Sequence, residues 1–211
     1  MNLEKIIMEA LPALQKTGTW IQNEAQSFDL NKVVLKGKND LVSYVDKEAE
    51  KKLVIDLKSI LPEAGLVTEE DTANDDQKKF TWIVDPLDGT TNFIHGLPVY
   101  SISFGLLQGK DIVGGIVYEL NKKELFYAWK GGGTFLNDNP IRVAPTQDLS
   151  NSLLATGFPY YQFDKLDNYL AIIKDLMMHS HSLRRLGSAA VDLAYVACSR
   201  YEGFFEYNLN A

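Results

Sequence analysis

Two aspartates follow an apolar run in the segment WIVDPLDGTTNF, residues 82–93. Asp85 and Asp88 have no Lys or Arg within this segment. Two carboxylates held close together without a cation repel each other, and one of them then takes up a proton near neutral pH. A bound metal ion removes this repulsion, and ligands that are all oxygen atoms suit a hard ion such as Mg²⁺. The pair therefore predicts a magnesium site.

A second acidic cluster, Glu69 and Glu70, ends the short β-rich segment that begins GLV at residue 65. If this segment and residues 80–84 form neighbouring strands, the carboxylates of both clusters meet at one edge of a sheet, where α/β proteins keep their sites. Pro86 restricts Asp85 to an extended conformation. The turn can then present both aspartates, together with the carbonyl group of Leu87, to one point.

The residues after the aspartates are suited to phosphate. Gly89 allows close approach of the backbone, Thr90 and Thr91 supply hydroxyl groups, and TTNF can open a helix whose free N–H groups face an anion. The segment KGKNDLVSYVD, residues 36–46, is expected to be a basic, flexible loop that then becomes extended. Read alone it is a solvated loop. Beside a phosphate site, Lys36, Lys38 and Asp40 would form a mobile flap over the anion.

Other motifs with similar residues fail on spacing. An EF-hand loop has ligands at alternate positions, but Leu87 stands where the second ligand belongs. Phosphatases of the haloacid dehalogenase type separate their two aspartates by two residues, whereas Asp85 and Asp88 are three apart with a proline between them. Asp85 is therefore a poor candidate for a covalent phosphoaspartate. The run Gly131–Gly133 is not followed by a helix, so the dinucleotide fingerprint fails as well.

The elements that must position these residues follow from periodicity. Apolar residues at helical spacing predict a first helix over residues 3–21, with a kink at Pro12, and a second over 46–60. Alternating residues from 100 to 143 predict an antiparallel meander. After Pro145 the pattern predicts strand 153–156, helix 166–180, strand 182–187, helix 188–200 and strand 201–208. We therefore expect two halves, an α+β half over residues 1–145 with the metal site and the meander, and an α/β half over 146–211.

Composition limits the function. The chain has 211 residues, 21 Lys and Arg against 28 Asp and Glu, a net charge of −7 and one cysteine. An acidic balance argues against nucleic acid as the default partner, and a single cysteine fits a reducing compartment. The amino-terminal residues do not resemble a signal peptide, and no apolar run is long enough to cross a bilayer. These features predict a soluble cytoplasmic protein.

Three segments carry a resemblance to a known family: TEED, WIVDPLDGTTNFIHGLPVYSISFGLL and LRRLGSAAVDLAYVACSRYEGFFEYNLNA. In order along the chain they resemble the inositol monophosphatase family of Mg²⁺-dependent, lithium-sensitive phosphatases. The element D-P-x-D-G-T-x-x-F is highly specific. The resemblance implies a layered αβαβα sandwich of the inositol monophosphatase and fructose-1,6-bisphosphatase type, and a homodimer.

The resemblance also implies roles for individual residues. Glu69, Asp85 and the carbonyl of Leu87 would hold the activating metal, and Asp85 with Asp88 would hold the second. Asp46 and Thr90 would pair near the attacking water, beside Glu69 as a further catalytic residue. The remaining implied contacts are to phosphate, from Gly89 and Thr90, and to the inositol hydroxyls, from Ser188, Ala189 and Glu206.

The implied reaction is hydrolysis of inositol monophosphate, or a similar small sugar phosphate, by in-line attack of water at two or three Mg²⁺ ions. Two alternatives remain open. One keeps the chemistry and changes the substrate to fructose 1,6-bisphosphate or a nucleotide 3′-phosphate. The other is a non-catalytic family member that binds RNA or protein, against which the acidic balance argues weakly.

One motif of the family is expected after the last residue of this sequence. The family continues from FFEYNLNA into a Trp-Asp-x-Ala-Ala element whose aspartate is the remaining ligand of the second metal, while this sequence stops at Ala211. We therefore expect the second half to be incomplete and the natural protein to be longer.

Overall fold

The computed structural model describes residues 2–29, 33–37, 40–70, 73–75, 78–159, 163–207 and 209, with the backbone alone at 33–37, 40–42 and 74. The helices are α1 Leu3–Ala25, α2 Tyr44–Ile60, α3 Thr90–Ile94, α4 Leu166–His179 and α5 Ala189–Ala197. The strands are β1 Val33–Gly37, β2 Asp40–Ser43, β3 Gly65–Thr68, β4 Asn74–Asp75, β5 Phe80–Asp88, β6 Ser101–Gln108, β7 Asp111–Glu119, β8 Glu124–Trp129, β9 Gly133–Leu136, β10 Asn139–Pro140, β11 Leu153–Thr156, β12 Ser182–Arg184 and β13 Gly203–Phe205.

An eight-stranded sheet carries most of the chain, in the order β10-β9-β8-β7-β6-β5-β3-β4. Strands β6 to β10 follow one another as antiparallel neighbours, which confirms the meander predicted for residues 100–143. The one parallel pair in this sheet, among the residues that the structure describes, is β3 with β5. The two strands that end in acidic residues are therefore neighbours with the same direction.

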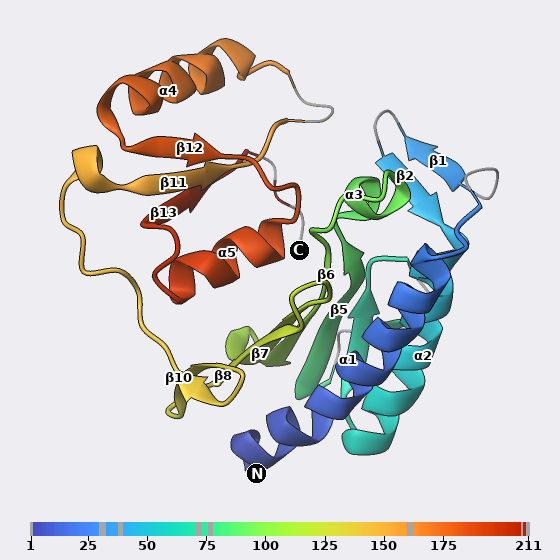
Figure 1. Ribbon diagram of the computed structural model, residues 1–211. Coiled ribbons are helices and arrows are strands. Elements are labelled where there is room, and N and C mark those ends of the chain that lie inside the picture. Colours follow the sequence, from blue (N-terminus) through green and yellow to red (C-terminus); the bar gives the residue numbers. More distant parts are fainter. Residues whose placement is uncertain are drawn as a thin grey trace.

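The layers alternate between helix and sheet (Figure 1). Helices α1 and α2 cover one face of the large sheet, and α5 contacts both β6 and β7 of the large sheet and β13 of a smaller one. Helix α4 contacts β12 on the outer side of the smaller sheet. The arrangement is the αβαβα sandwich expected from the resemblance.

The predicted start of the second helix needs correction. Helix α1 continues through Pro12, and the kink expected there stays a prediction. Helix α2 begins at Tyr44, two residues before the expected start at Asp46, because Ser43 caps it. The Ser43 hydroxyl accepts a hydrogen bond from the N–H of Val45 at 3.1 Å, and the Asp46 carboxylate accepts one from the N–H of Ser43 at 2.9 Å.

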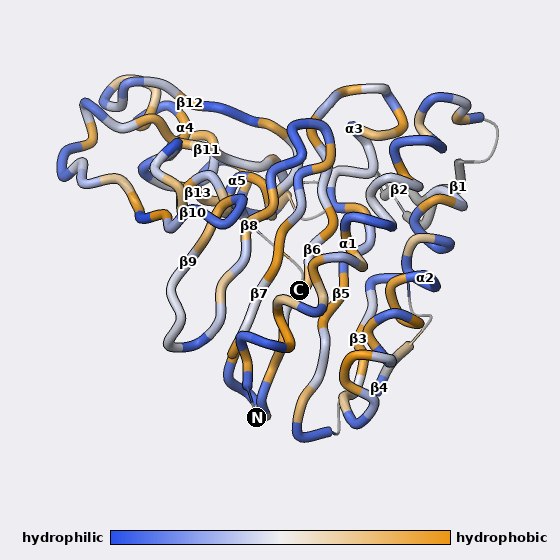
Figure 2. Tube along the Cα trace, turned by 60° about the horizontal axis from the view of Figure 1, so that its bottom comes forward, coloured by the Kyte–Doolittle hydropathy of each residue, from blue (hydrophilic) through white to orange (hydrophobic). Residues whose placement is uncertain are grey.

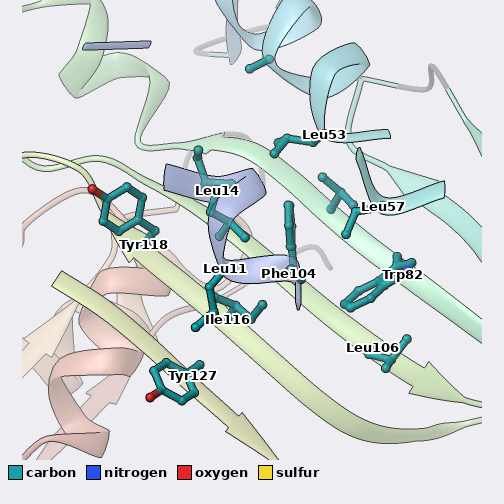
Figure 3. Packing of buried hydrophobic residues seen from close by; sticks show 14 of the residues in the cluster. Leu11, Leu14, Leu53, Leu57, Trp82, Phe104, Leu106, Ile116, Tyr118 and Tyr127 are labelled. Atoms are coloured by element: carbon teal, nitrogen blue, oxygen red, sulfur yellow. The ribbon is translucent and has the colours of Figure 1, made fainter. Parts of the chain in front are cut away.

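The apolar faces of α1 and α2 pack onto the sheet to form the main core (Figure 3). Leu14 from α1 and Leu53 and Leu57 from α2 are fully buried, as are Trp82 of β5 and Leu106 of β6. Full burial of one such side chain stabilises the fold by about 1.5–3 kcal/mol. Because α2 is fixed to this sheet through its buried face, any polar side chain on the same face is held firmly as well.

The smaller sheet has the order β12-β11-β13, with all pairs parallel. Parallel neighbours need crossover connections. Helix α4 connects β11 to β12, and α5 connects β12 to β13. This confirms the α/β pattern predicted after Pro145, whereas the division into halves at residue 145 stays a prediction.

The carboxyl end of α5 is fastened to the large sheet. Arg200 donates two hydrogen bonds to the Glu124 carboxylate, at 2.5 and 2.6 Å, and its guanidinium lies 4.5 Å from the centre of the Tyr195 ring. Lys122 donates to the Tyr195 hydroxyl at 2.8 Å. These contacts hold α5 between the two sheets.

The segment predicted as a flexible loop, residues 36–46, is mostly regular. Strands β1 and β2 pair as an antiparallel hairpin, with Lys36 in β1 and Asp40 in β2, and α2 follows. Lys38 lies outside the described residues. The role of this hairpin as a flap over phosphate stays a prediction.

Figure 2 shows hydrophobic colour along the strands of the large sheet and hydrophilic colour at turns between them. Over the part of the chain that the structure describes, none of the helices combines the length and the apolar character needed to cross a membrane. The buried hydrophobic residues of α1 and α2 face the large sheet, whereas α4 leaves Leu170, Met177 and Met178 exposed.

Candidate active site

A bulge in β5 aims both aspartates at one place. Asp85 lies opposite Ser103 of β6 and Asp88 opposite Ser101, so three steps along β5 match two steps along β6. Residues three apart on a regular strand point to opposite faces, and one extra residue restores a common face. Both aspartates accordingly line the same pocket, which has a volume of about 490 Å³. The sequence predicted this convergence but placed it in a turn after the strand, whereas β5 continues through Asp88.

Asp85 is the most crowded carboxyl group of the pocket. Its Oδ1 accepts a hydrogen bond from the N–H of Leu87 at 3.0 Å. Burial first, then the charges of Asp88 and Glu69 and a hydrogen bond with the Glu69 carboxyl group, hold the pKa of Asp85 well above its usual range. Without a cation, this group is forced toward its protonated form.

Glu69 reaches Asp85 because β3 and β5 are parallel neighbours, with Thr68 opposite Val84. The side chain of Glu69 is exposed and lines the pocket. Glu69, Asp85 and Asp88 together form what we call the acidic wall.

Asp46 and Thr90, predicted to pair near the attacking water, are in contact. The Thr90 hydroxyl lies 2.9 Å from Oδ1 of Asp46 and 2.9 Å from the carbonyl oxygen of Leu87, and can donate to either. Asp46 is buried, and its Oδ2 accepts from the Ser43 hydroxyl at 2.6 Å. Burial raises the pKa of Asp46, while the hydrogen bonds from Ser43 and Thr90 oppose that rise.

Gly89 separates the acidic wall from α3. Its φ of +92° is in the left-handed region that favours glycine, and a side chain here would come within 3.0 Å of the carbonyl oxygen of Val99. This residue therefore allows the backbone to turn from β5 into α3, which Thr90 begins.

Asp88 faces the second half of the chain. Its Oδ2 accepts hydrogen bonds from the Ser188 hydroxyl at 2.6 Å and from the N–H of Ala190 at 2.7 Å. Burial raises the pKa of Asp88, and these two donors together with the charge of Arg185 oppose the rise. The amino-terminal turn of α5 thus closes over the end of β5.

A second part of the pocket lining comes from the segment between β12 and α5, from α5 itself and from the segment after β13. We call it the substrate wall, and its members are Arg185, Ser188, Ala189, Ala190, Asp192 and Glu206. The Glu206 carboxylate lies against Gly157, where even a Cβ atom would come within 1.9 Å of it. Burial raises the pKa of Glu206, and the charge of Arg185 opposes the rise.

The structure brings the predicted residues Asp46, Glu69, Asp85, Leu87, Asp88, Gly89 and Thr90 to the end of β5, and Ser188, Ala189 and Glu206 to the substrate wall. Sequence reasoning missed Arg185, Ala190 and Asp192. It also missed Asn92, a buried residue whose amide donates to the carbonyl of Val99 at 2.7 Å and to that of Leu186 at 2.8 Å. Asn92 therefore ties α3 to the segment that leads into α5.

The chemistry of the acidic wall fits magnesium. All its donors are oxygen atoms, and the crowding that raises the pKa of Asp85 is what a divalent cation would relieve. Within the described residues, no three acidic, histidine or cysteine side chains already surround one point as metal ligands. The hydrogen bonds from Ser188 and Ala190 both go to Oδ2 of Asp88, so Oδ1 is the oxygen that Asp88 would offer to a cation shared with the other two.

Comparisons with known proteins show which family this chain resembles in sequence. A sequence model of the inositol monophosphatase family matches residues 2–211. An inositol-1-monophosphatase from Mesorhizobium japonicum is 38% identical over 200 residues, which cover 94% of this chain and 75% of the relative. A putative Nus factor SuhB from Neisseria meningitidis is 39% identical over 201 residues, covering 95% of this chain and 77% of the relative.

Solved structures give the same result. The extragenic suppressor protein suhB from Bartonella henselae superposes with a TM-score of 0.90 at 36% identity, covering 97% of this chain and 79% of that one. An inositol monophosphatase from Thermotoga maritima superposes with a TM-score of 0.85 at 31% identity, covering 94% of this chain and 75% of that one. The chain therefore belongs to the inositol monophosphatase family.

Proposed function

We propose that this protein is a Mg²⁺-dependent phosphomonoesterase that hydrolyses inositol monophosphate or a similar small sugar phosphate. The observation that carries the proposal is one pocket with two chemically different sides. The acidic wall supplies carboxylates for a cation, and the substrate wall supplies hydroxyl, carboxylate and backbone groups that can bind a polyol. Family membership supports phosphatase chemistry, and relatives named inositol-1-monophosphatase support the substrate class.

Asp46 and Thr90 are suited to handle the proton of the attacking water. The Thr90 hydroxyl has one hydrogen, so when it donates to Asp46 its lone pairs are available to accept a hydrogen bond from water. A carboxylate whose pKa is raised is a better proton acceptor than an ordinary aspartate. The pair can therefore orient the water and take its proton toward Asp46.

Glu69, Asp85, Asp88 and the carbonyl oxygen of Leu87 would hold two or three Mg²⁺ ions. Bound Mg²⁺ would lower the pKa of water and neutralise charge on the departing oxygen. The contacts of Asp85 with the N–H of Leu87 and with Glu69 suit a ligand rather than a nucleophile. We therefore expect inversion at phosphorus without a phosphorylated aspartate.

The substrate wall favours a monophosphate. Asp192 and Glu206 contribute two carboxyl groups against the single cation of Arg185. Carboxyl groups form hydrogen bonds with sugar hydroxyls, and in their ionised form they repel a second phosphate. Inositol or sugar monophosphates are therefore better substrates than fructose 1,6-bisphosphate or nucleotide bisphosphates in this proposal.

A substrate panel tests the proposal. Phosphate release is measured with Mg²⁺ on inositol 1-phosphate, fructose 1,6-bisphosphate and adenosine 3′,5′-bisphosphate. We expect the highest kcat/KM on inositol 1-phosphate and inhibition by lithium ions in the millimolar range, which the family resemblance implies. Preference for a bisphosphate would overturn the substrate assignment. Failure to hydrolyse any of the three compounds would overturn the proposal that the protein is a phosphatase.

A second candidate function has one observation in its favour, because several relatives are named Nus factor SuhB. This chain would then also act by binding a macromolecular partner. Such a role should survive Asp85→Asn, whereas phosphatase activity should not, so the same variant separates the two. A homodimer and a cytoplasmic location remain part of the proposal.

A further inference from the structure

Glu50 is a completely buried glutamate outside the ligand set described above. It lies on α2 one turn after Asp46, and residues four apart on a helix share a face. That face is the one that packs on the large sheet, where Asp46 holds Thr90. A buried carboxyl group on a core-facing surface is costly unless it makes specific hydrogen bonds.

One contact of Glu50 is with the segment just after β3. Its Oε2 accepts a hydrogen bond from the N–H of Glu70 at 2.7 Å. On the other side, the N–H of Glu69 donates to the carbonyl of Val84 in β5 at 3.2 Å. The backbone of Glu69 is thus held on both sides, by β5 at its own N–H and by α2 at the next one.

Beyond β3 the chain has no further parallel pairing with β5 among the described residues. The hydrogen bond from Glu70 to Glu50 therefore replaces the next contact of a continuing strand. This hydrogen bond fixes the backbone position of Glu69. It thereby sets how closely the Glu69 carboxyl group approaches Asp85.

We propose that Glu50 is a positioning residue that fixes the Glu69 carboxylate in the acidic wall, so that α2 sets both the Asp46–Thr90 pair and the metal-binding edge. The proposal rests on the proposed function, since it assumes that the acidic wall binds a divalent cation. Glu50 acts through a hydrogen bond to the backbone and touches neither metal nor substrate. Removing such a supporting contact typically weakens metal binding by 10- to 100-fold.

The test uses the full chain and Mn²⁺ as a probe for Mg²⁺. The electron paramagnetic resonance signal of free Mn²⁺ falls as the ion binds, so its loss measures the bound fraction. Glu50→Gln keeps an oxygen acceptor for the N–H of Glu70, whereas Glu50→Met keeps the length of the side chain and removes the acceptor. We expect Glu50→Met to weaken Mn²⁺ binding by about tenfold or more. We expect the Mn²⁺ affinity of Glu50→Gln to stay within about threefold of that of the natural chain, because glutamine keeps the hydrogen-bond acceptor.

Leu53→Ala is the matched control. Leu53 is fully buried on the same helix, so this variant should be clearly less stable than the natural chain. Where it remains folded, judged by urea unfolding, it should bind Mn²⁺ as the natural chain does. Loss of metal binding in Leu53→Ala equal to that in Glu50→Met would show a general effect of instability and overturn the proposal.

Two further outcomes overturn it. If Glu50→Met binds Mn²⁺ as tightly as the natural chain, Glu50 does not position a ligand. If Glu50→Gln is weakened as much as Glu50→Met, the charge of Glu50 matters and its hydrogen bond to Glu70 does not. Should Glu50→Met fail to fold, weakened Mn²⁺ binding by folded Glu50→Gln overturns the proposal, and intact binding supports it. A natural chain that binds no Mn²⁺ would instead contradict the proposed function.

Discussion

The two walls of the pocket differ in how they are built. In the acidic wall, the contacts of Asp85 and of the Glu69–Glu70 backbone span at most about twenty residues, such as Leu87 with Asp85 and Glu70 with Glu50. The substrate wall contacts the end of β5 over about a hundred residues, from Ser188 and Ala190 to Asp88. The first wall gathers negative charge, and the second supplies donors to one member of it.

This difference indicates a division of labour. In the acidic wall, burial and the charges of Asp88 and Glu69 raise the pKa of Asp85, and a bound cation would oppose that rise. The substrate wall supplies the donors, from Ser188 and Ala190, that hold Asp88 in the absence of a cation, while Oδ1 of its own Asp192 is unpaired among the described residues. We therefore expect variants of the acidic wall to affect chemistry most, and variants of the substrate wall to affect stability and substrate choice.

The largest effect is expected from Asp85→Asn. This change removes a charge shared by the proposed ions and keeps the shape of the side chain, so phosphate release should fall by at least about a hundredfold. It also relieves repulsion from Asp88 and Glu69, so without metal the free energy of unfolding should rise. Urea unfolding in EDTA and a phosphate assay in Mg²⁺ check both halves. Activity that survives, in a variant shown to be folded, would remove Asp85 from the site.

Thr90→Val should lower kcat by about a hundredfold or more, because it deletes the hydroxyl that contacts Asp46 and leaves a side chain of the same shape. Thr90→Ser retains the hydroxyl and is the matched control, with an expected loss of less than about tenfold. The measurement is kcat at saturating Mg²⁺. Equal losses in both variants would mean that the methyl group of Thr90, not its hydroxyl, is required.

Asp192→Asn tests the charge of the substrate wall through the pH dependence of the free energy of unfolding. Asp192 is buried, with Oδ1 unpaired among the described residues, and burial followed by repulsion from Asp88 raises its pKa from 3.8 to about 7. The folded state therefore favours the protonated form, so the stability of the natural chain falls as pH rises from about 4 to 7. Asparagine stays neutral throughout.

We accordingly expect Asp192→Asn to be more stable than the natural chain at pH 8, by about 2 kcal/mol, and by less at pH 5. The whole shift corresponds to roughly 4 kcal/mol, and we expect about half of it because Asp192 lines a pocket that is open to solvent, which screens its charge. Urea unfolding in EDTA at both pH values provides the data, with exposed Asp167→Asn as the control for losing one charge. A stability difference between Asp192→Asn and the natural chain that does not change with pH would contradict a raised pKa of Asp192.

Ser188→Ala is expected to have the smallest effect. It removes the 2.6 Å hydrogen bond to Asp88 and the cap on the N–H of Val191. Stability should fall by about 1–2 kcal/mol, with a modest change in KM and little change in kcat. Chemical denaturation and steady-state kinetics measure these quantities. A large fall in kcat would place Ser188 in the chemistry instead.

The sequence was most informative where chemistry and local structure coincide. Asp85 and Asp88 could be assigned to one site because a proline, a glycine and two threonines surround them within a few residues. The bulge could not be foreseen, since it depends on the pairing of β5 with β6. The start of α2 was missed by two residues because Ser43 and Asp46 form a reciprocal cap.

The second wall was less accessible to prediction. Arg185 and Asp192 were read as parts of a strand and a helix, and nothing in their spacing shows that both line the pocket. Asn92 sits beside the threonines that attracted attention, but its partner Leu186 is 94 residues away. Contacts of this length depend on how the two sheets pack around α5, which no local pattern in the sequence encodes.

The most direct test of the central claim is phosphate release from inositol 1-phosphate in Mg²⁺, after chelation with EDTA, and after Mg²⁺ is restored. We predict hydrolysis in Mg²⁺, loss of activity in EDTA and full recovery on restoring the ion, because the acidic wall needs a cation to act. Undiminished hydrolysis in EDTA would contradict the account.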